Sequence, residues 1–72
     1  MTVPSQKDLM DVRAKCERNC PNESEFRRRL AEHQITHGLD FDIDWREAAN
    51  GFPPTPMFIN VYDANMKFLC SI

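Results

Sequence analysis

Two cysteines and two histidines in the first half of the chain have a spacing that could do chemistry. Three residues separate Cys16 from Cys20. Twelve residues lie between Cys20 and His33, and three more lie between His33 and His37. Thiolate sulfur and imidazole nitrogen are the ligands that zinc prefers in closed tetrahedral sites. The stretch from residue 16 to residue 37 is therefore a candidate zinc site.

The spacing C-x3-C-x12-H-x3-H resembles that of the C2H2 zinc finger, over about a third of the chain. Leu30 adds to the resemblance, because it stands three residues before His33, as the core leucine of a finger does. The resemblance implies one zinc ion as cofactor. It implies as ligands Cys16, Cys20, His33 and His37. It also implies that recognition of nucleic acid is one function to consider.

The residues around the first cysteine predict a helix. Ser5 is a suitable N-cap, and Leu9, Val12 and Cys16 then recur at helical spacing. Pro21 ends this helix at the latest. Cys16 therefore continues an apolar stripe, which a buried core residue would also do.

A second helix is predicted between Asn22 and Gly38. Asn22 and Glu25 form a capping signature, and Gly38 is a typical C-terminal stop. The predicted inner stripe is Phe26, Leu30, His33 and His37. If both helices are straight and antiparallel, Cys20 lies near the turn and His33 lies about 16 Å further along. In that case the cysteines and histidines are core residues, and a zinc site requires the cysteine segment to leave the helix.

The distribution of charge bears on nucleic-acid binding. Residues 1–38 carry seven Lys or Arg against six Asp or Glu, and residues 39–72 carry two against five, for a net charge of −2. Nucleic-acid binders usually cluster a basic excess on one face. The residues that would contact phosphates are Lys15, Arg18, Arg27, Arg28 and Arg29. Glutamates three or four positions away on the same helix would pair with the arginines, so nucleic-acid binding is the alternative function.

The second half of the chain predicts a connector, a short helix and a linker. Residues 39–44 alternate apolar and acidic side chains, which fits a short strand or an extended connector. Asp44 with Glu47 forms a capping box, and Gly51 supplies a stop, so a short helix is predicted between them. The prolines of residues 52–56 predict a rigid linker.

The last twenty residues predict a β-hairpin. Residues 57–62 and 66–72 are rich in strand-forming side chains and flank a short turn. A type I turn with Asn65 in the left-handed region fits this loop. An isolated hairpin is marginal in water, so one face must pack on the helices. The predicted inner face is Met57, Ile59 and Val61.

These elements predict an α+β fold with two or three short helices followed by a C-terminal hairpin, in one domain over residues 1–72. Its parts are a lead-in (1–4), a helical part (5–38), an acidic connector with a short helix (39–51), and a proline linker with the hairpin (52–72). A chain this short buries only about 60% of its unfolded surface. Small domains often need a metal, a disulfide or a partner as a staple.

The sequence also bears on the location of the protein and on whether it is an enzyme. No apolar leader or span stands out, and the count of three cysteines is odd, which indicates a reducing, cytoplasmic setting and no membrane. His33 or His37 could be combined with Asp40, Asp42 or Asp44 as a hydrolytic site. No spacing resembles a known catalytic motif, so an enzyme is not expected.

The preferred function is that of a small regulatory or adaptor protein that binds a larger protein, as a monomer or a homodimer. Compact single-domain chains of this kind are common among phage-type and other accessory proteins that inhibit host machinery. An exposed hairpin edge could pair with a partner strand. Aromatic side chains are frequent anchors of interfaces, and those predicted to bind the partner are Trp45, Phe52, Phe58 and Tyr62.

Overall fold

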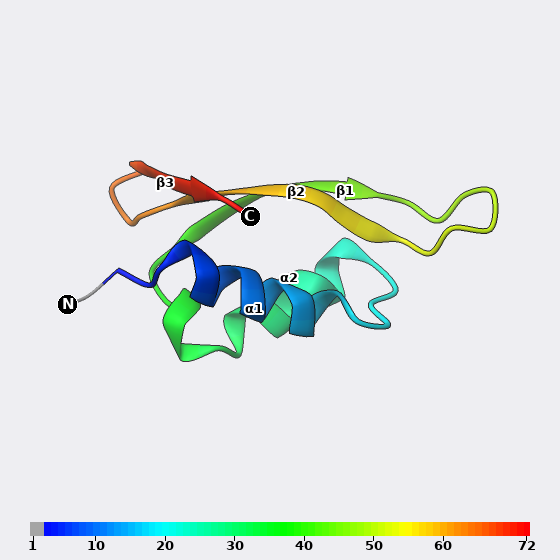
Figure 1. Ribbon diagram of the computed structural model, residues 1–72, viewed down its shortest axis with the longest axis horizontal. Coiled ribbons are helices and arrows are strands. Elements are labelled where there is room, and N and C mark those ends of the chain that lie inside the picture. Colours follow the sequence, from blue (N-terminus) through cyan, green and yellow to red (C-terminus); the bar gives the residue numbers. More distant parts are fainter. Residues whose placement is uncertain (1–2) are drawn as a thin grey trace.

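A computed structural model describes residues 3–72 as two helices packed on one face of a three-stranded antiparallel sheet (Figure 1). The helices are α1 (Gln6–Glu17) and α2 (Glu23–Ala31), followed by the 3-10 turn η1 (Gln34–Thr36). The strands are β1 (Asp40–Arg46), β2 (Thr55–Tyr62) and β3 (Phe68–Ser71), with β2 in the centre. The α+β class is confirmed. The predicted hairpin is present, and the sheet contains one strand more.

Helix α1 forms where the sequence predicts it. The Ser5 hydroxyl accepts a hydrogen bond from the Asp8 amide at 3.2 Å, which satisfies one of the free donors of the first turn. The side chains facing the core are Leu9, Val12 and Cys16. Because α1 ends at Glu17, Cys20 lies outside it, in the turn that leads to α2.

Helix α2 begins as predicted but ends early, at Ala31. The Asn22 side chain accepts a hydrogen bond from the Glu25 amide at 2.8 Å and caps the first turn. At the other end, the hydroxyl of the buried Thr36 donates to the carbonyl oxygen of Leu30. The Leu30 carbonyl oxygen thus accepts a hydrogen bond from a side chain, whereas in a longer helix it would accept one from the backbone amide four residues later.

The early end of α2 breaks the predicted apolar stripe. Gly38 has φ +82°, which a residue with a Cβ adopts only at a cost, and it turns the chain toward β1. Leu30 is buried, whereas His33 is half-buried and His37 is exposed. The two histidines therefore do not extend the inner face of a helix.

The prediction of a short helix between Asp44 and Gly51 is wrong. Asp44 lies inside β1, opposite Phe58 of β2. The chain reverses at Asn50 and Gly51, whose φ values of +50° and +82° are those of a type I′ turn, and Asn-Gly is the commonest sequence for that turn. Reciprocal backbone hydrogen bonds between residues 49 and 52 close it. Pairing with β2 buries the inner face of β1, which a single exposed helical turn could not do.

The turn predicts a cost for any side chain at Gly51. The Gly51→Ala variant is expected to lose about 1 kcal/mol of unfolding free energy, because φ +82° is strained for a residue with a Cβ. Urea denaturation followed by circular dichroism measures the loss. Asn50→Gly is the matched control and should change stability far less, since glycine adopts φ +50° without strain. Equal losses in the two variants would contradict this assignment of the turn.

The predicted proline linker is partly strand. Pro56 pairs with Trp45 at the start of β2, beyond the end of β3. A proline is tolerated there because its nitrogen has no neighbouring strand to donate to. The Arg13 guanidinium on α1 donates to the carbonyl oxygens of Pro56 at 2.7 Å and Met57 at 3.2 Å. The linker is therefore confined to the residues before Thr55.

In the turn between β2 and β3, the left-handed residue is Met66, at φ +63°, and not Asn65 as predicted. The Asp63 carboxylate accepts hydrogen bonds from the amides of Asn65 at 2.8 Å and Lys67 at 2.9 Å. The Met66 amide donates to the Asp63 carbonyl oxygen, which closes a four-residue turn whose last residue is the left-handed Met66.

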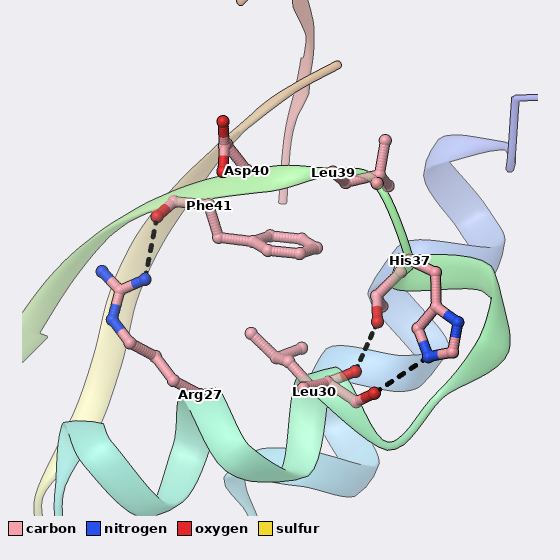
Figure 2. A pocket seen from close by; sticks show the side chains of 9 residues that line it. Arg27, Leu30, His37, Leu39, Asp40 and Phe41 are labelled. Atoms are coloured by element: carbon pink, nitrogen blue, oxygen red, sulfur yellow. Dashed lines mark hydrogen bonds between the residues drawn. The ribbon is translucent and has the colours of Figure 1, made fainter. Parts of the chain in front are cut away.

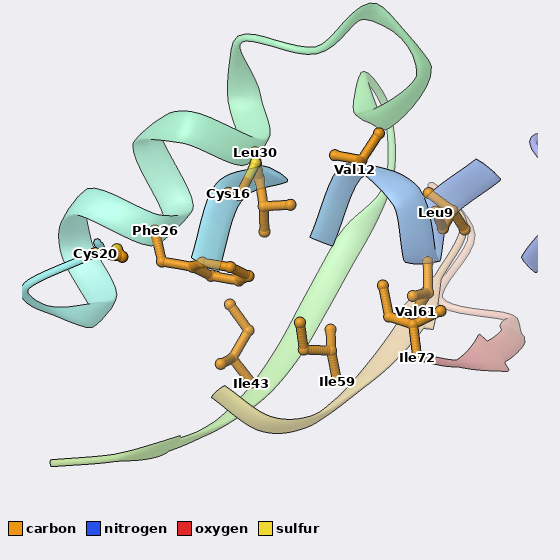
Figure 3. Packing of buried hydrophobic residues seen from close by; sticks show 10 residues of the cluster. All are labelled: Leu9, Val12, Cys16, Cys20, Phe26, Leu30, Ile43, Ile59, Val61 and Ile72. Atoms are coloured by element: carbon orange, nitrogen blue, oxygen red, sulfur yellow. The ribbon is translucent and has the colours of Figure 1, made fainter. Parts of the chain in front are cut away.

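The core lies between the helices and the inner face of the sheet (Figure 3). Ile59 and Val61 are buried as predicted, whereas Met57 is exposed. The register shifts at Asp44 and Trp45, so that Met57 has no partner in β1 and the bulge turns it outward. The buried apolar residues are Leu9, Val12, Cys16, Cys20, Phe26, Leu30, Ile43, Ile59, Val61 and Ile72.

Candidate functional site

The residues that resemble zinc-finger ligands occupy two different parts of the fold. Cys16 and Cys20 are buried in the core cluster (Figure 3). His33 follows the far end of α2, about 13 Å of helix away from the turn that holds Cys20. The exposed His37 donates through Nε2 to the Ala31 carbonyl oxygen at 3.1 Å (Figure 2). Across residues 3–72, no three His, Cys, Asp or Glu side chains gather as a metal site requires.

These positions do not fit a closed four-ligand zinc site, so zinc stays a prediction from the sequence. Elemental analysis of protein purified without a metal-affinity tag tests it. A four-ligand site would give about one zinc per chain, lost in the Cys16→Ser, His37→Ala double variant. From the separation of the ligands we expect far less than one zinc per chain. A stoichiometric content that the double variant loses would contradict this expectation.

Two of the three thiols, those of Cys16 and Cys70, lie in surroundings that disfavour the thiolate. Burial raises the pKa of Cys16 above its ordinary value of 9.0, while Arg29 nearby opposes the shift. Burial also raises the pKa of Cys70. The Cys20 thiol donates to the Asn22 carbonyl oxygen at 3.3 Å. Because the thiolate is the nucleophile, neither Cys16 nor Cys70 has the electrostatic setting of a reactive cysteine.

The arginine cluster of α2 is committed to contacts within the protein. Arg27 pairs with Glu23 at 2.8 Å, and Arg28 pairs with both Glu25 and Glu32. Arg29 pairs with Glu25 at 3.3 Å and also donates to the carbonyl oxygens of Cys16 in α1 and Arg18 after it. Phosphate contacts would have to break these pairs. The remaining predicted basic residues, Lys15 and Arg18, are exposed.

The Glu25 carboxylate should make the unfolding free energy depend on pH in the acidic range. Hydrogen bonding from Arg28, helped by the charge of Arg28 and by Arg29, lowers the pKa of Glu25 from 4.5 to about 2. A lowered pKa stabilises the folded state above the unfolded value, and this contribution is lost as pH falls from 4.5 toward 2. The wild type and Glu25→Gln should therefore differ in unfolding free energy at neutral pH and converge near pH 2. A difference independent of pH in urea titrations would contradict this origin.

The predicted aromatic anchors are divided among three places. Trp45 lies on the inner side of β1, half-buried, with its ring centroid 5.8 Å from that of Phe26. Its indole Nε1 is buried and has no hydrogen-bond acceptor among the described residues. Phe52 is 68% exposed in the loop between β1 and β2, which extends beyond the helices in Figure 1. Only Phe58 and Tyr62 lie on the outer face of the sheet.

The outer face of the sheet, which the helices leave uncovered, carries aromatic and acidic side chains. Phe58 and Phe68 are 51% and 52% exposed, and the Tyr62 and Phe68 rings meet edge to face with centroids 5.8 Å apart. The Ser71 hydroxyl donates to Asn60 Oδ1 at 2.6 Å between them. The exposed residues of β1 opposite this part of β2 are Asp40, Asp42 and Asp44.

Phe68 is not among the site residues that the sequence predicts, and the aspartates of β1 are predicted there only as partners of a histidine. Phe68 pairs with Tyr62 on the neighbouring strand, and it reaches the outer face through a register shift between Val61 and Tyr62 that simple alternation does not reveal. The aspartates face outward because β1 is a strand whose Phe41 and Ile43 point to the core. Within residues 3–72, none of the three takes part in an ion pair.

A pocket of about 390 Å³ opens between the second half of α2, the turn after it, and the start of β1 (Figure 2). The Leu30 side chain and the Phe41 ring point into it from opposite sides. At the rim, the Arg27 guanidinium donates to the Phe41 carbonyl oxygen at 3.2 Å. His37 and Asp40 line the same rim, and no hydrogen bond joins them in the described part of the chain. The pocket is thus an apolar space with its polar rim bonded to backbone, and not an arranged acid and base.

Comparisons with protein-family models, with curated proteins and with solved structures give no significant match to this chain. Over residues 3–72, neither helix has the length and apolar character needed to cross a bilayer.

Proposed function

We propose that this chain is a small binding module that acts by docking on a larger protein. The observation that carries the proposal is the uncovered outer face of the sheet, where Phe58 and Phe68 are exposed and Tyr62 packs against Phe68, beside an acidic strand. Large aromatic side chains exposed on one face are costly in water and are typical of interaction surfaces. We include in this proposal that the docked chain regulates the larger protein, or inhibits host machinery.

Two features support protein binding over the alternative of nucleic-acid binding. The arginines of α2 pair with glutamates on the same helix, which leaves little free positive charge for phosphates. The outer face carries Asp40, Asp42 and Asp44, which would repel a phosphate backbone. No observation favours the nucleic-acid function enough to keep it as a second candidate.

Affinity capture from the source cell tests the proposal, with a matched pair of variants. The face variant replaces Phe58 and Phe68 by serine, and the control replaces the exposed Met10 of α1 by serine. We expect the wild type and the control to capture the same protein, and the face variant to lose it. Capture that is unchanged by the face variant would count against this surface. Circular dichroism on all three proteins separates lost binding from lost folding.

A further inference from the structure

Strand β1 is an edge strand of the sheet, and the alternation of hydrogen bonds along a strand shows which of its backbone groups point away from β2. The Ile59 amide and carbonyl bond to Ile72, on the side of β2 that faces away from β1. In an antiparallel pair, the residue opposite such a position also turns its backbone groups away from the partner strand. Ile43 lies opposite Ile59, so its N–H and C=O point to the free edge, and Trp45 follows two residues later. The Phe41 carbonyl oxygen, two residues before Ile43, accepts a hydrogen bond from Arg27 and so also points away from β2.

Side chains from the helices cover backbone elsewhere along the sheet edges. Gln6 donates to the Ser71 carbonyl oxygen of β3 at 2.7 Å, and Arg13 donates to the free end of β2. On β1, Arg27 reaches only the Phe41 carbonyl oxygen. Among the described residues, no side-chain hydrogen bond reaches the backbone of Ile43 or Trp45. An edge with free donors and acceptors is a template for an added strand.

The chemistry on the two sides of this edge differs. On the outer side, Asp42 and Asp44 flank Ile43 and are exposed. On the inner side, Ile43 is buried and Trp45 is half-buried against the core. Successive side chains of an added strand point alternately to these two sides. The edge therefore fits a segment in which basic residues alternate with apolar ones.

A second copy of the chain does not fit the same edge. If two β1 strands paired antiparallel about Ile43, Asp42 of each would lie opposite Asp44 of the other. Like charges directly opposite each other destabilise a strand pair. The aspartates thus disfavour pairing with the chain itself and favour a basic partner strand.

Resting on the proposed protein-binding function, we propose that the β1 edge binds an extended segment of the partner by strand addition. Its basic side chains lie opposite Asp42 and Asp44, and its apolar side chains lie on the inner side beside Ile43 and Trp45. Main-chain hydrogen bonds to Ile43 and Trp45 give the affinity of such a complex, and the alternation gives its specificity. Arg27 bounds the site at its bond to the Phe41 carbonyl oxygen.

The probe is a peptide with capped ends and alternating lysine and valine, as long as the seven residues of β1. Its control has the same composition with all lysines placed together. In ¹⁵N-¹H spectra of the full chain, we expect the alternating peptide to shift the amides of Ile43 and Trp45 and the control peptide to bind much more weakly. Stronger shifts at Phe58 and Tyr62 than at these amides, or equal binding of both peptides, would overturn strand addition.

Charge reversal supplies the second arm of the test. Asp42→Lys should weaken binding of the alternating peptide about tenfold, since one attractive cross-strand pair becomes repulsive. Asp11→Lys on α1 is the matched control, with the same change in net charge at an exposed position, and should leave binding unchanged. Equal weakening by both variants would overturn the site. So would shifts of Ile43 that grow with protein concentration in the absence of peptide, because a second copy would then be the occupant.

The two proposals fail in different ways. If the peptide does not bind but capture of a cellular protein still depends on Phe58 and Phe68, strand addition is overturned and the protein-binding function stands. If peptide binding is absent and capture does not depend on the outer face, both are overturned.

Discussion

Replacing Phe26 by alanine is expected to remove about 3 to 5 kcal/mol of unfolding free energy. Phe26 is fully buried and packs against Trp45 across the interface between α2 and the sheet. A domain of 72 residues has about 4 to 11 kcal/mol of stability in total. The variant should therefore be largely unfolded, or close to it, under conditions in which the wild type is folded.

Urea denaturation followed by circular dichroism and by Trp45 fluorescence measures the effect. Phe68→Ala is the control, because Phe68 is 52% exposed and its loss should change stability by no more than about 0.5 kcal/mol. Phe26→Leu keeps much of the volume and should lie between the two. Similar losses for Phe26→Ala and Phe68→Ala would mean that the core is not centred on the contact of α2 with β1.

The Arg29→Met variant is expected to lose about 2 kcal/mol, mainly from backbone carbonyls that lose their charged donor. The Arg29 guanidinium donates to the carbonyl oxygens of Arg18 at 2.7 Å and Cys16 at 3.2 Å. It thereby joins the C-terminal end of α1 to α2 across the turn. Methionine retains the aliphatic stem, so that packing is preserved and the loss reports on the hydrogen bonds.

Arg28→Met is the matched control for Arg29, one residue away on the same helix. The Arg28 side chain is 59% exposed, and within residues 3–72 it bonds only to the glutamates Glu25 and Glu32. Exposed ion pairs contribute about 0 to 1 kcal/mol, so this variant should lose less than Arg29→Met. Comparison of the two urea transitions decides the matter. An equal or larger loss in Arg28→Met would show that the turn does not depend on the guanidinium of Arg29.

The sequence by itself determined the parts of this protein that depend on local signals. The caps at Ser5 and Asn22 and the stripe of Leu9, Val12 and Cys16 place the helix starts and the inner face of α1. These signals act within a few residues, because a cap and a helical period are satisfied inside a single segment. The β-branched segments after Thr55 likewise indicate the C-terminal strands.

Local signals misled where two segments compete for the same residues. The capping box of Asp44 and Glu47 predicts a helix, yet the alternation of β1 and the Asn50–Gly51 turn give more burial through pairing with β2. Asn-Gly between two alternating segments was the signal that could have corrected this prediction. The pattern of four zinc ligands has the same weakness, because spacing along the chain does not show that α2 ends at Ala31 and that a buried threonine closes it.

Only the tertiary structure decided which surfaces are free. The helices cover one face of the sheet, so Trp45 became an inner residue while Phe58, Tyr62 and Phe68 stayed on the outer face. Whether a side chain is buried depends on which face of a strand meets the helices, and a single register shift changes it, as Met57 shows. The open edge of β1 depends on strand order as well. Contacts between segments distant in sequence set both features, which is why no local pattern contained them.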